Sequence, residues 1–446
     1  MRRFVRLLIA AYLGASFVLA QEPEEVPKGT ESTAPVVEGP REVSLAEFEQ
    51  LALQNNPTLA QAAAQVQISR GKAIQAGLYP NPTVGYVADQ VGVNGTAGEL
   101  QGGFVQQEIV TGGKLRISRA KYQQEVQQAQ AQFEAQEFRV LSTVRGAFYK
   151  TLATQRQAEV RTELARNAEE ALKTTRGLLN VGQANRPDVL QAEVQVQRMR
   201  AAARAAERRS SGHWQELTAV VGMPQLEVAP LSGKLEISEA EIIDRDEALA
   251  NLLNCSPQFQ VAWAEIRKDQ IAVQRELVEP IPNFNVRAET GKNYDTNNTV
   301  LGLTVGIKLP IYDRNQGSIM QARAELSRAQ AEIGRIEMML RKKFGETFAE
   351  YDADLATARS FEKEILPKAR EAYESYLDSY QKRRAAWPQV LVAQREYFQL
   401  SDEYLETLLE LRTAEAEIKG LFLGSGLDQP PAPNPGGHRD ATPRPR

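Results

Sequence analysis

One stretch decides the fold: KLRISRAKYQQEVQQAQAQFEAQEFRVLSTVRGAFYKTLATQRQAEVRTELARNAEEALKTTRGLLN, residues 114–180. It holds no proline, and its only glycine before Gly177 is Gly146. Good helix formers (Ala, Gln, Glu, Arg, Leu) fill most of it. A continuous helix over these 67 residues is ~100 Å long at ~1.5 Å per residue. Globular helices rarely exceed ~25 residues, so the stretch predicts a coiled coil or a helical tube.

The apolar residues of this stretch recur in steps of three, four and seven, with small alanines between them. They are Val126, Ala129, Phe133, Val140, Val144, Phe148 and Leu152. Residues 181–188 then supply a glycine for reversal, Gly182, and a proline to restart a helix, Pro187. The chain is therefore predicted to turn here and run back.

Residues 1–20 read as a secretory signal peptide, with Arg2, Arg3 and Arg6 before an apolar core and a cleavage site ending at Ala20. A membrane anchor is the alternative, but the apolar run is too short and no other span of ~18 apolar residues exists. Residues 21–43 mix Glu, Pro, Ser and Gly and predict a disordered leader. Cys255 is the only cysteine, so no intrachain disulfide and no lipid-anchoring cysteine near the signal are expected. We expect Cys255 to pack as a small apolar residue near a helix end.

Composition excludes several classes of function. Lys+Arg at 53 against Asp+Glu at 57, a net charge of −4, argues against a nucleic-acid partner. Of the two histidines, His213 reads as a surface or packing residue, and His438 lies in the tail, so neither a metal site nor a cofactor is predicted. Gly112-Gly113-Lys114 resembles the end of a phosphate loop, but Leu115 replaces the required hydroxyl. No nucleophile–base pair or carboxylate dyad is evident, so no catalytic residue is assigned and the chain is predicted not to be an enzyme.

The order of elements is duplicated. Helical pattern begins at Ser44, pauses at Asn56-Pro57 and ends near Gly77, and two extended stretches then lead into the long helix. Ser256-Pro257 and Pro282 repeat Asn56-Pro57 and Pro82 200 residues later. Residues 44–224 and 245–424 are therefore two repeats, joined by a linker, 225–244, and followed by a disordered tail, 425–446. The second long helix, from about residue 316 to 380, is predicted to kink at Pro367.

Each repeat contains two lines of helix of equal length. In the first, residues 44–77 and 187–221 placed end to end match the length of residues 114–180. One line is unbroken and the other is in two pieces.

The extended stretches of the second repeat, 283–289 and 300–309, alternate in polarity with a turn at 293–298, which is typical of outer-membrane barrel strands. The predicted lipid-facing set is Phe284, Val286, Leu301, Leu303, Val305 and Ile307. The predicted lumen-facing set is Asn285, Arg287, Glu289, Thr304 and Lys308. An amphipathic sheet over a soluble core is the alternative. Four strands cannot close a barrel alone, so the protomer is expected to assemble with copies of itself.

On these grounds the chain, over residues 44–423, resembles the outer-membrane efflux protein (TolC) family. The resemblance rests on Asn56-Pro57, on residues 106–114 at the strand-to-helix junction, on Gly182 and on residues 188–193. It implies a mainly α fold with a small β part: long α-helical hairpins forming an α-barrel, plus four transmembrane β-strands per protomer, internally duplicated. It further implies a homotrimer in the outer membrane of a Gram-negative-type bacterium, with a periplasmic adaptor protein and an inner-membrane pump, here of the RND type.

The two hairpin turns are expected to meet the adaptor at the far end of the tube. The residues assigned to them are Gly182, Arg186, Pro187, Asp188, Arg383, Arg384 and Pro388. Arg383 stands where the first turn has Gly182, a departure from the glycine usual in the family. Glu374, Asp378 and Lys382 are candidates for a gate, and a solvated helix face is the alternative.

Residues 80–82 and 108–114 resemble the heavy-metal (CzcC-like) branch, which implies divalent cations as cargo. Drug efflux and the outer duct of a type I protein-secretion system remain alternatives within the family. A periplasmic coiled-coil scaffold without a pore is the alternative of another class, and the paired strands argue against it.

Overall fold

The computed structural model describes residues 42–89, 91, 99–182, 184–382 and 384–431. The predicted signal peptide, the leader up to residue 41, Arg383 and residues 432–446 of the tail lie outside the described residues. The statements below concern the described part alone.

The first repeat has the predicted order of elements. These are α2 Leu45–Asn55, α3 Pro57–Gln75, β2 Thr83–Asp89, β3 Leu100–Ile109, α4 Lys114–Asn180 and α5 Arg186–Val221. The single long helix α4 runs over all 67 residues of the stretch that predicted it. At its start, Ser44 and Glu47 form the expected capping box, because each side chain bonds the other residue's backbone N–H, at 3.4 and 3.1 Å.

The second repeat follows in the same order. Its elements are α6 Arg245–Cys255, α7 Pro257–Val278, β5 Phe284–Asn293, β6 Thr299–Ile307, α8 Gln316–Ser360, the π-helical turn η3 Phe361–Ile365, α9 Leu366–Gln381 and α10 Trp387–Lys419. The expected interruption of the long helix begins at Phe361 rather than at Pro367 itself. Proline has no N–H and its ring meets the carbonyl four residues earlier, so the hydrogen bonds of the preceding turn shift, and Leu366 donates to the Phe361 carbonyl.

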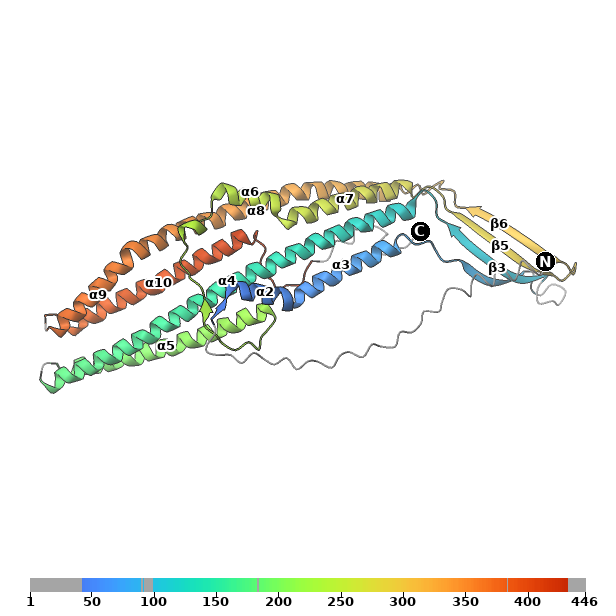
Figure 1. Cartoon of the computed structure of the whole chain (residues 1–446). Helices are drawn as coiled ribbons and strands as arrows, with labels where there is room; N and C mark the ends of the chain where they lie inside the picture. The colour runs from blue at the N-terminus through green and yellow to red at the C-terminus, as the bar shows by residue number, and fades with distance from the viewer. Residues whose placement is uncertain (1–41, 90, 92–98, 183, 383, 432–446) are drawn as a thin grey trace. The chain divides into compact units, whose positions relative to one another are not determined.

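The helices pack around α4. Its neighbours are α3 and α7 in the part next to the strands, and α5 and α10 in the part that leads to the hairpin turns (Figure 1). The largest buried cluster lies where these parts meet. There the Phe48 ring contacts Phe148 and Trp214, with ring centroids 6.0 and 5.8 Å apart. Such aromatic contacts add to the burial of apolar area that holds the repeats together.

The linker, residues 225–244, crosses this region, and we call it the strap. Its strand β4, Leu231–Ser232, pairs in parallel with β1, Val43–Ser44. The predicted disordered leader therefore ends earlier than expected, because Val43 is paired in a sheet. Toward the second repeat, the Ile243 N–H donates to the Tyr351 hydroxyl at 3.2 Å.

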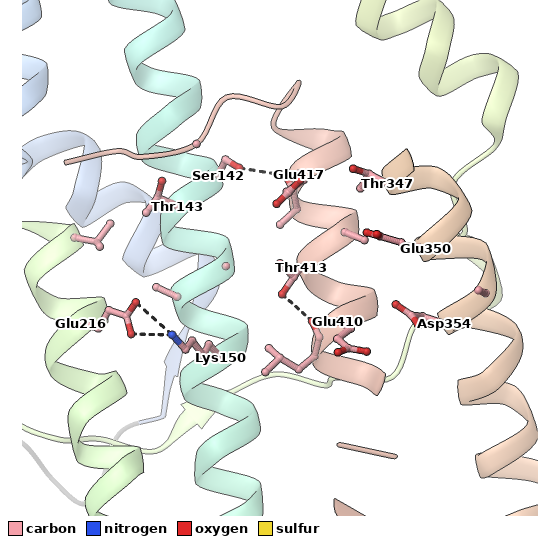
Figure 2. Close-up of a pocket in the computed structure, with 18 residues that line it drawn as sticks. Ser142, Thr143, Lys150, Glu216, Thr347, Glu350, Asp354, Glu410, Thr413 and Glu417 are labelled. Atoms are coloured by element: carbon pink, nitrogen blue, oxygen red, sulfur yellow. Dashed lines mark hydrogen bonds and ion pairs between the residues drawn. The ribbon is translucent and has the colours of Figure 1, made fainter. Parts of the chain in front are cut away.

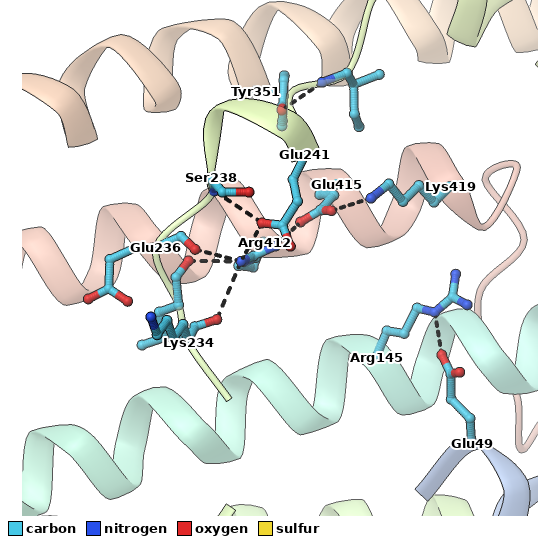
Figure 3. Close-up of polar contacts among 12 residues, drawn as sticks. Glu49, Arg145, Lys234, Glu236, Ser238, Glu241, Tyr351, Arg412, Glu415 and Lys419 are labelled. Carbon is cyan, nitrogen blue, oxygen red and sulfur yellow. Dashed lines mark hydrogen bonds and ion pairs between the residues drawn. The ribbon is translucent and has the colours of Figure 1, made fainter. Parts of the chain in front are cut away.

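Arg412 on α10 holds the middle of the strap (Figure 3). Its guanidinium donates to the carbonyls of Leu235 and Glu236, at 2.9 and 2.7 Å, and pairs with Glu415 at 2.7 Å. A second carboxylate, Glu241 of the strap, lies at 3.3 Å. The side chain of Arg412 is only 5 % exposed, so these acceptors replace the water that burial removes.

Two further expectations are corrected. The predicted tail begins too early at residue 425, because Gly426 is buried and its carbonyl accepts from Thr58 Oγ1 at 3.0 Å. The preceding Leu421 and Phe422 enter the main core and carry the following residues across α4. Cys255 does end a helix, α6, but it is exposed rather than packed.

We predict that Arg412→Met lowers the free energy of unfolding by about 3 kcal/mol, because it leaves buried carbonyls and Glu415 without their donor. Chemical denaturation of the purified protein measures the change. Arg370→Met is the matched control: its pair with Glu374 is exposed and contributes about 0–0.5 kcal/mol. Equal midpoints for the two variants would contradict the anchoring role of Arg412.

Candidate functional site

The four long strands form one antiparallel sheet in the order β2-β3-β5-β6. Within the described residues, the outer edges of β2 and β6 have no strand partner. β5 runs to Asn293, four residues beyond the predicted Glu289, and its last N–H donates to the Asn298 carbonyl at 2.9 Å. The register brings the two hairpins of the duplicated repeats together through β3 and β5.

One face of the sheet is apolar and exposed. The predicted lipid-facing residues share it, since Phe284 pairs with Ile307 and Val286 with Val305. Leu301 and Leu303 are 81 % and 70 % exposed. The register adds exposed residues of the first hairpin to this face: Val84, Tyr86, Val105 and Ile109. Large apolar side chains on four adjacent strands therefore face outward without cover from the chain itself.

The opposite face carries the polar residues. Arg287 and Glu289 form an ion pair at 2.9 Å, and Thr304 lies opposite Arg287 in the register. The guanidinium of Arg287 also lies over the Phe104 ring, 4.2 Å from its centroid. Sequence reasoning missed Phe104, because β3 alternates less clearly than β6. Asn285 shares this face, and Lys308 follows the end of β6, exposed.

The stretch that resembles a phosphate loop is a structural clamp between strand and helix. Lys114 is 3 % exposed, and its ammonium donates to the Ile281 carbonyl at 2.6 Å and to Asn283 Oδ1 at 3.1 Å. Asn283 in turn donates to Glu108 at 2.8 Å. Burial lowers the pKa of Lys114, and the nearby charge of Glu279 partly offsets that shift. These contacts fix the angle at which β3 continues into α4.

The two hairpin turns lie at the ends of α4 and α9, as expected. Gly182 has φ +72°, the left-handed conformation that glycine tolerates, and Arg186, Pro187 and Asp188 begin α5. The Asp188 carboxylate accepts from the Asn185 N–H at 3.1 Å.

The second turn has a different chemistry. Trp387 is 5 % exposed, and its ring lies 4.9 Å from that of Tyr380. Pro388 follows in the first turn of α10, and the Arg384 N–H donates to the Ser379 carbonyl at 2.7 Å. Packing of aromatic rings therefore closes this turn where the first uses a glycine.

The gate candidates pair within their own helix. Glu374 accepts from Arg370 at 2.8 Å, and Asp378 accepts from Lys382 at 2.8 Å, all four side chains being exposed. In a single chain they make a charged surface near the turn. Their role in a gate stays a prediction.

Two searches of the described residues bear on membranes and metals. None of the helices there combines the length and the hydropathy needed to cross a membrane. The same residues contain no group of three or more His, Cys, Asp or Glu placed to hold a metal ion. His213 instead lies beside a carboxylate, with Nδ1 3.1 Å from Glu216.

A family model described as "Outer membrane efflux protein" matches residues 49–223 and again 248–422, which coincide closely with the two repeats. The chain belongs to the outer membrane efflux protein family. It is thus an outer-membrane efflux channel and not an enzyme. The expected fold class is confirmed.

Individual relatives agree with this family. The cobalt-zinc-cadmium resistance protein CzcC of Cupriavidus metallidurans is 25 % identical over 417 residues, which cover 92 % of this chain and 96 % of CzcC. This relation supports the resemblance to the CzcC-like branch. The outer-membrane channel OprN is 16 % identical, with a TM-score of 0.71 over 86 % of this chain and 91 % of that one. The outer membrane protein VceC from Vibrio cholerae is 17 % identical, with a TM-score of 0.67 over 86 % of this chain and 97 % of VceC.

We predict that Val305→Arg prevents stable membrane insertion of this efflux channel, because a charge on the lipid-facing side near the midplane costs about 2–4 kcal/mol. Thr304→Arg is the matched control, since it adds the same charge one residue away on the polar face. The measurement is the amount of each variant in the outer-membrane fraction. Normal insertion of Val305→Arg would contradict the assignment of the apolar face to lipid.

Proposed function

We propose that the chain is the passive exit duct of a tripartite efflux pump, through which substrates leave by a trimeric β-barrel and a periplasmic α-barrel. The observation that carries the proposal is the sheet, apolar on one face and polar on the other, joined by the Lys114 clamp to a helix of 67 residues. A scaffold without a pore has no use for such a sheet.

Assembly from copies follows from the unpaired edges of β2 and β6. Unpaired backbone groups cost several kcal/mol each in hydrocarbon, so both edges need strand partners. An even number of strands per chain keeps the sheet antiparallel when β6 of one copy meets β2 of the next. Three copies supply twelve strands, the number that the resemblance to the TolC family implies. Native mass measurement of the detergent-solubilised protein tests the trimer, and a folded, inserted monomer would contradict it.

The adaptor is proposed to dock at the hairpin turns and along the grooves beside them. A groove of about 470 Å³ on α9 and α10 is lined in part by Tyr376, Pro388 and Val392. The corresponding groove on α4 and α5 is lined by charged residues, among them Arg176 and Glu193, which pair at 2.7 Å. An apolar groove and a charged groove at the same end of the helices would recognise different side chains of a helical partner.

We further propose that the turns narrow the duct at rest. Exposed ion pairs contribute ~0–1 kcal/mol each, so a gate would need several acting together around the symmetry axis. Charge reversal at Asp378 and Lys382 is therefore expected to raise single-channel conductance in planar bilayers. The same reversal at Glu337 and Arg341, an exposed pair far from the turns, is the control. Unchanged conductance would show that the constriction lies elsewhere.

Divalent metal cations are the proposed cargo, on the relation to CzcC. The duct itself does not need a tight metal site, since selection can occur in the pump. Both signs of charge are present on the polar face of the sheet, and screening over ~8 Å at physiological salt limits their effect on passing ions. Drug efflux and type I protein secretion are the other uses of such a duct.

Deletion of the gene is expected to raise sensitivity to one or more of zinc, cobalt and cadmium, and growth in graded metal concentrations measures it. Complementation with the wild-type gene is the control for polar effects. Normal metal tolerance with heightened sensitivity to dyes, detergents or antibiotics would overturn the metal assignment and leave the duct intact.

A further inference from the structure

A cleft of about 900 Å³ lies between α4, α5, α8 and α10, at the height where the four helices pass the strap (Figure 2). Four carboxylates line it: Glu350 and Asp354 from α8, and Glu410 and Glu417 from α10. Lys150 is the one basic residue of the lining, and it is already paired with Glu216 at 3.2 Å. The negative charge on the α8 and α10 side is therefore not compensated from within the lining.

The carboxylates also lack cationic partners elsewhere. Across the residues that the structure describes, none of the four forms an ion pair. Burial raises the pKa of Asp354, and the like charges of Glu410 and Glu350 raise it further. A concave surface of one sign with low-dielectric walls concentrates its field and raises the local concentration of counter-ions.

A neutral oxygen is directed into the same cleft. Thr347 on α8 is 7 % exposed and lines the cleft. Other helical threonines, such as Thr143, Thr357 and Thr413, donate their hydroxyl to the carbonyl four residues earlier. Thr347 makes no such bond, and no other partner for its hydroxyl occurs in the described part of the chain. In Figure 2 its side chain points from α8 toward α10. Buried hydroxyls are normally hydrogen-bonded, so this one is available to a ligand.

The chemistry of the lining selects the class of ligand. All its candidate ligands are oxygens, and hard divalent cations prefer oxygen. The carboxylates are not gathered into a direct three-ligand site in the described residues, so a bound cation would keep most of its water. Six waters at ~30 Å³ each occupy roughly 180 Å³, which the cleft accommodates.

We propose that this cleft binds a hydrated divalent metal cation, held between Asp354 and Glu410 with the Thr347 hydroxyl as a further oxygen. The site goes beyond the proposed function, because binding in the purified protein does not depend on which cargo the cell exports. A channel for other substrates would still hold the cation here.

Mn²⁺ is the probe, and its electron paramagnetic resonance signal reports the free ion in titrations of the detergent-solubilised full-length protein. Asp354→Asn combined with Glu410→Gln is expected to weaken the strongest class of Mn²⁺ binding by about tenfold. The matched control combines Asp352→Asn with Glu403→Gln, which removes the same charges from exposed positions of the same two helices outside the cleft. It should bind as the wild type does.

Thr347→Val keeps every charge and the side-chain volume, so a weakening of about threefold in that variant assigns the hydroxyl to the site. Circular dichroism melting confirms that each variant is folded, and the Thr347 variant tests the proposal if the double variant is not. Mg²⁺ should displace Mn²⁺ at concentrations where tetramethylammonium does not. Equal binding by the cleft and control variants, or equal competition by tetramethylammonium, would overturn the proposal.

Discussion

Close packing of small side chains along α4 is the constraint on which the rest of the structure depends. α2, α3, α5, α7 and α10 all pack against this one helix. Ala129, Ala135, Ala147 and Ala168 are buried along it, so neighbouring backbones approach closely on more than one side. Protein interiors have little free volume, so larger residues there would separate the helices. A helix of 67 residues can thus serve as the common partner of both repeats.

Two buried cations turn this helical layer into a device for positioning the sheet and the turns. Lys114 fixes the passage from β3 to α4, and Arg412 fixes the strap against α10. In both cases backbone carbonyls supply acceptors, at Ile281 for the lysine and at Leu235 and Glu236 for the arginine. Burying a charge is unfavourable unless such bonds replace water, which explains why each cation is surrounded by several acceptors. The orientation of strands on helices therefore depends on electrostatics as well as on apolar packing.

The interior between α3, α4 and α7 is unusually polar for a helical core. Glu125 is 2 % exposed and pairs with Lys72 at 2.7 Å, and Gln136, fully buried, donates to Thr58 Oγ1 at 2.9 Å. Gln128 is also buried, and its carbonyl oxygen has no partner in the described residues. Polar contacts of this kind demand specific geometry, so they favour one register of neighbouring helices over the alternatives that a uniform alanine seam would permit. The duplication is imperfect for the same reason: Asn56 caps α3 and reaches Val220, whereas the Ser256 hydroxyl at the equivalent position has no partner in the described residues.

The sequence by itself determined the elements: the bounds of α4, the two hairpin turns, the duplication and the two faces of β6 all followed from it. These features are local, because they depend on runs of helix formers, on glycine and proline at turns and on alternation along a strand. Only the tertiary structure decided which polar residues are buried, that β5 extends to Asn293, that the strap is held by Arg412, and that Gly426 seats against Thr58, 368 residues earlier in the chain. It also decided that Asp378 pairs with Lys382 on its own helix, and that Phe104 lies under Arg287. Each of these depends on a partner brought close by folding or on a choice among several charges within reach, and neither spacing nor composition specifies that choice.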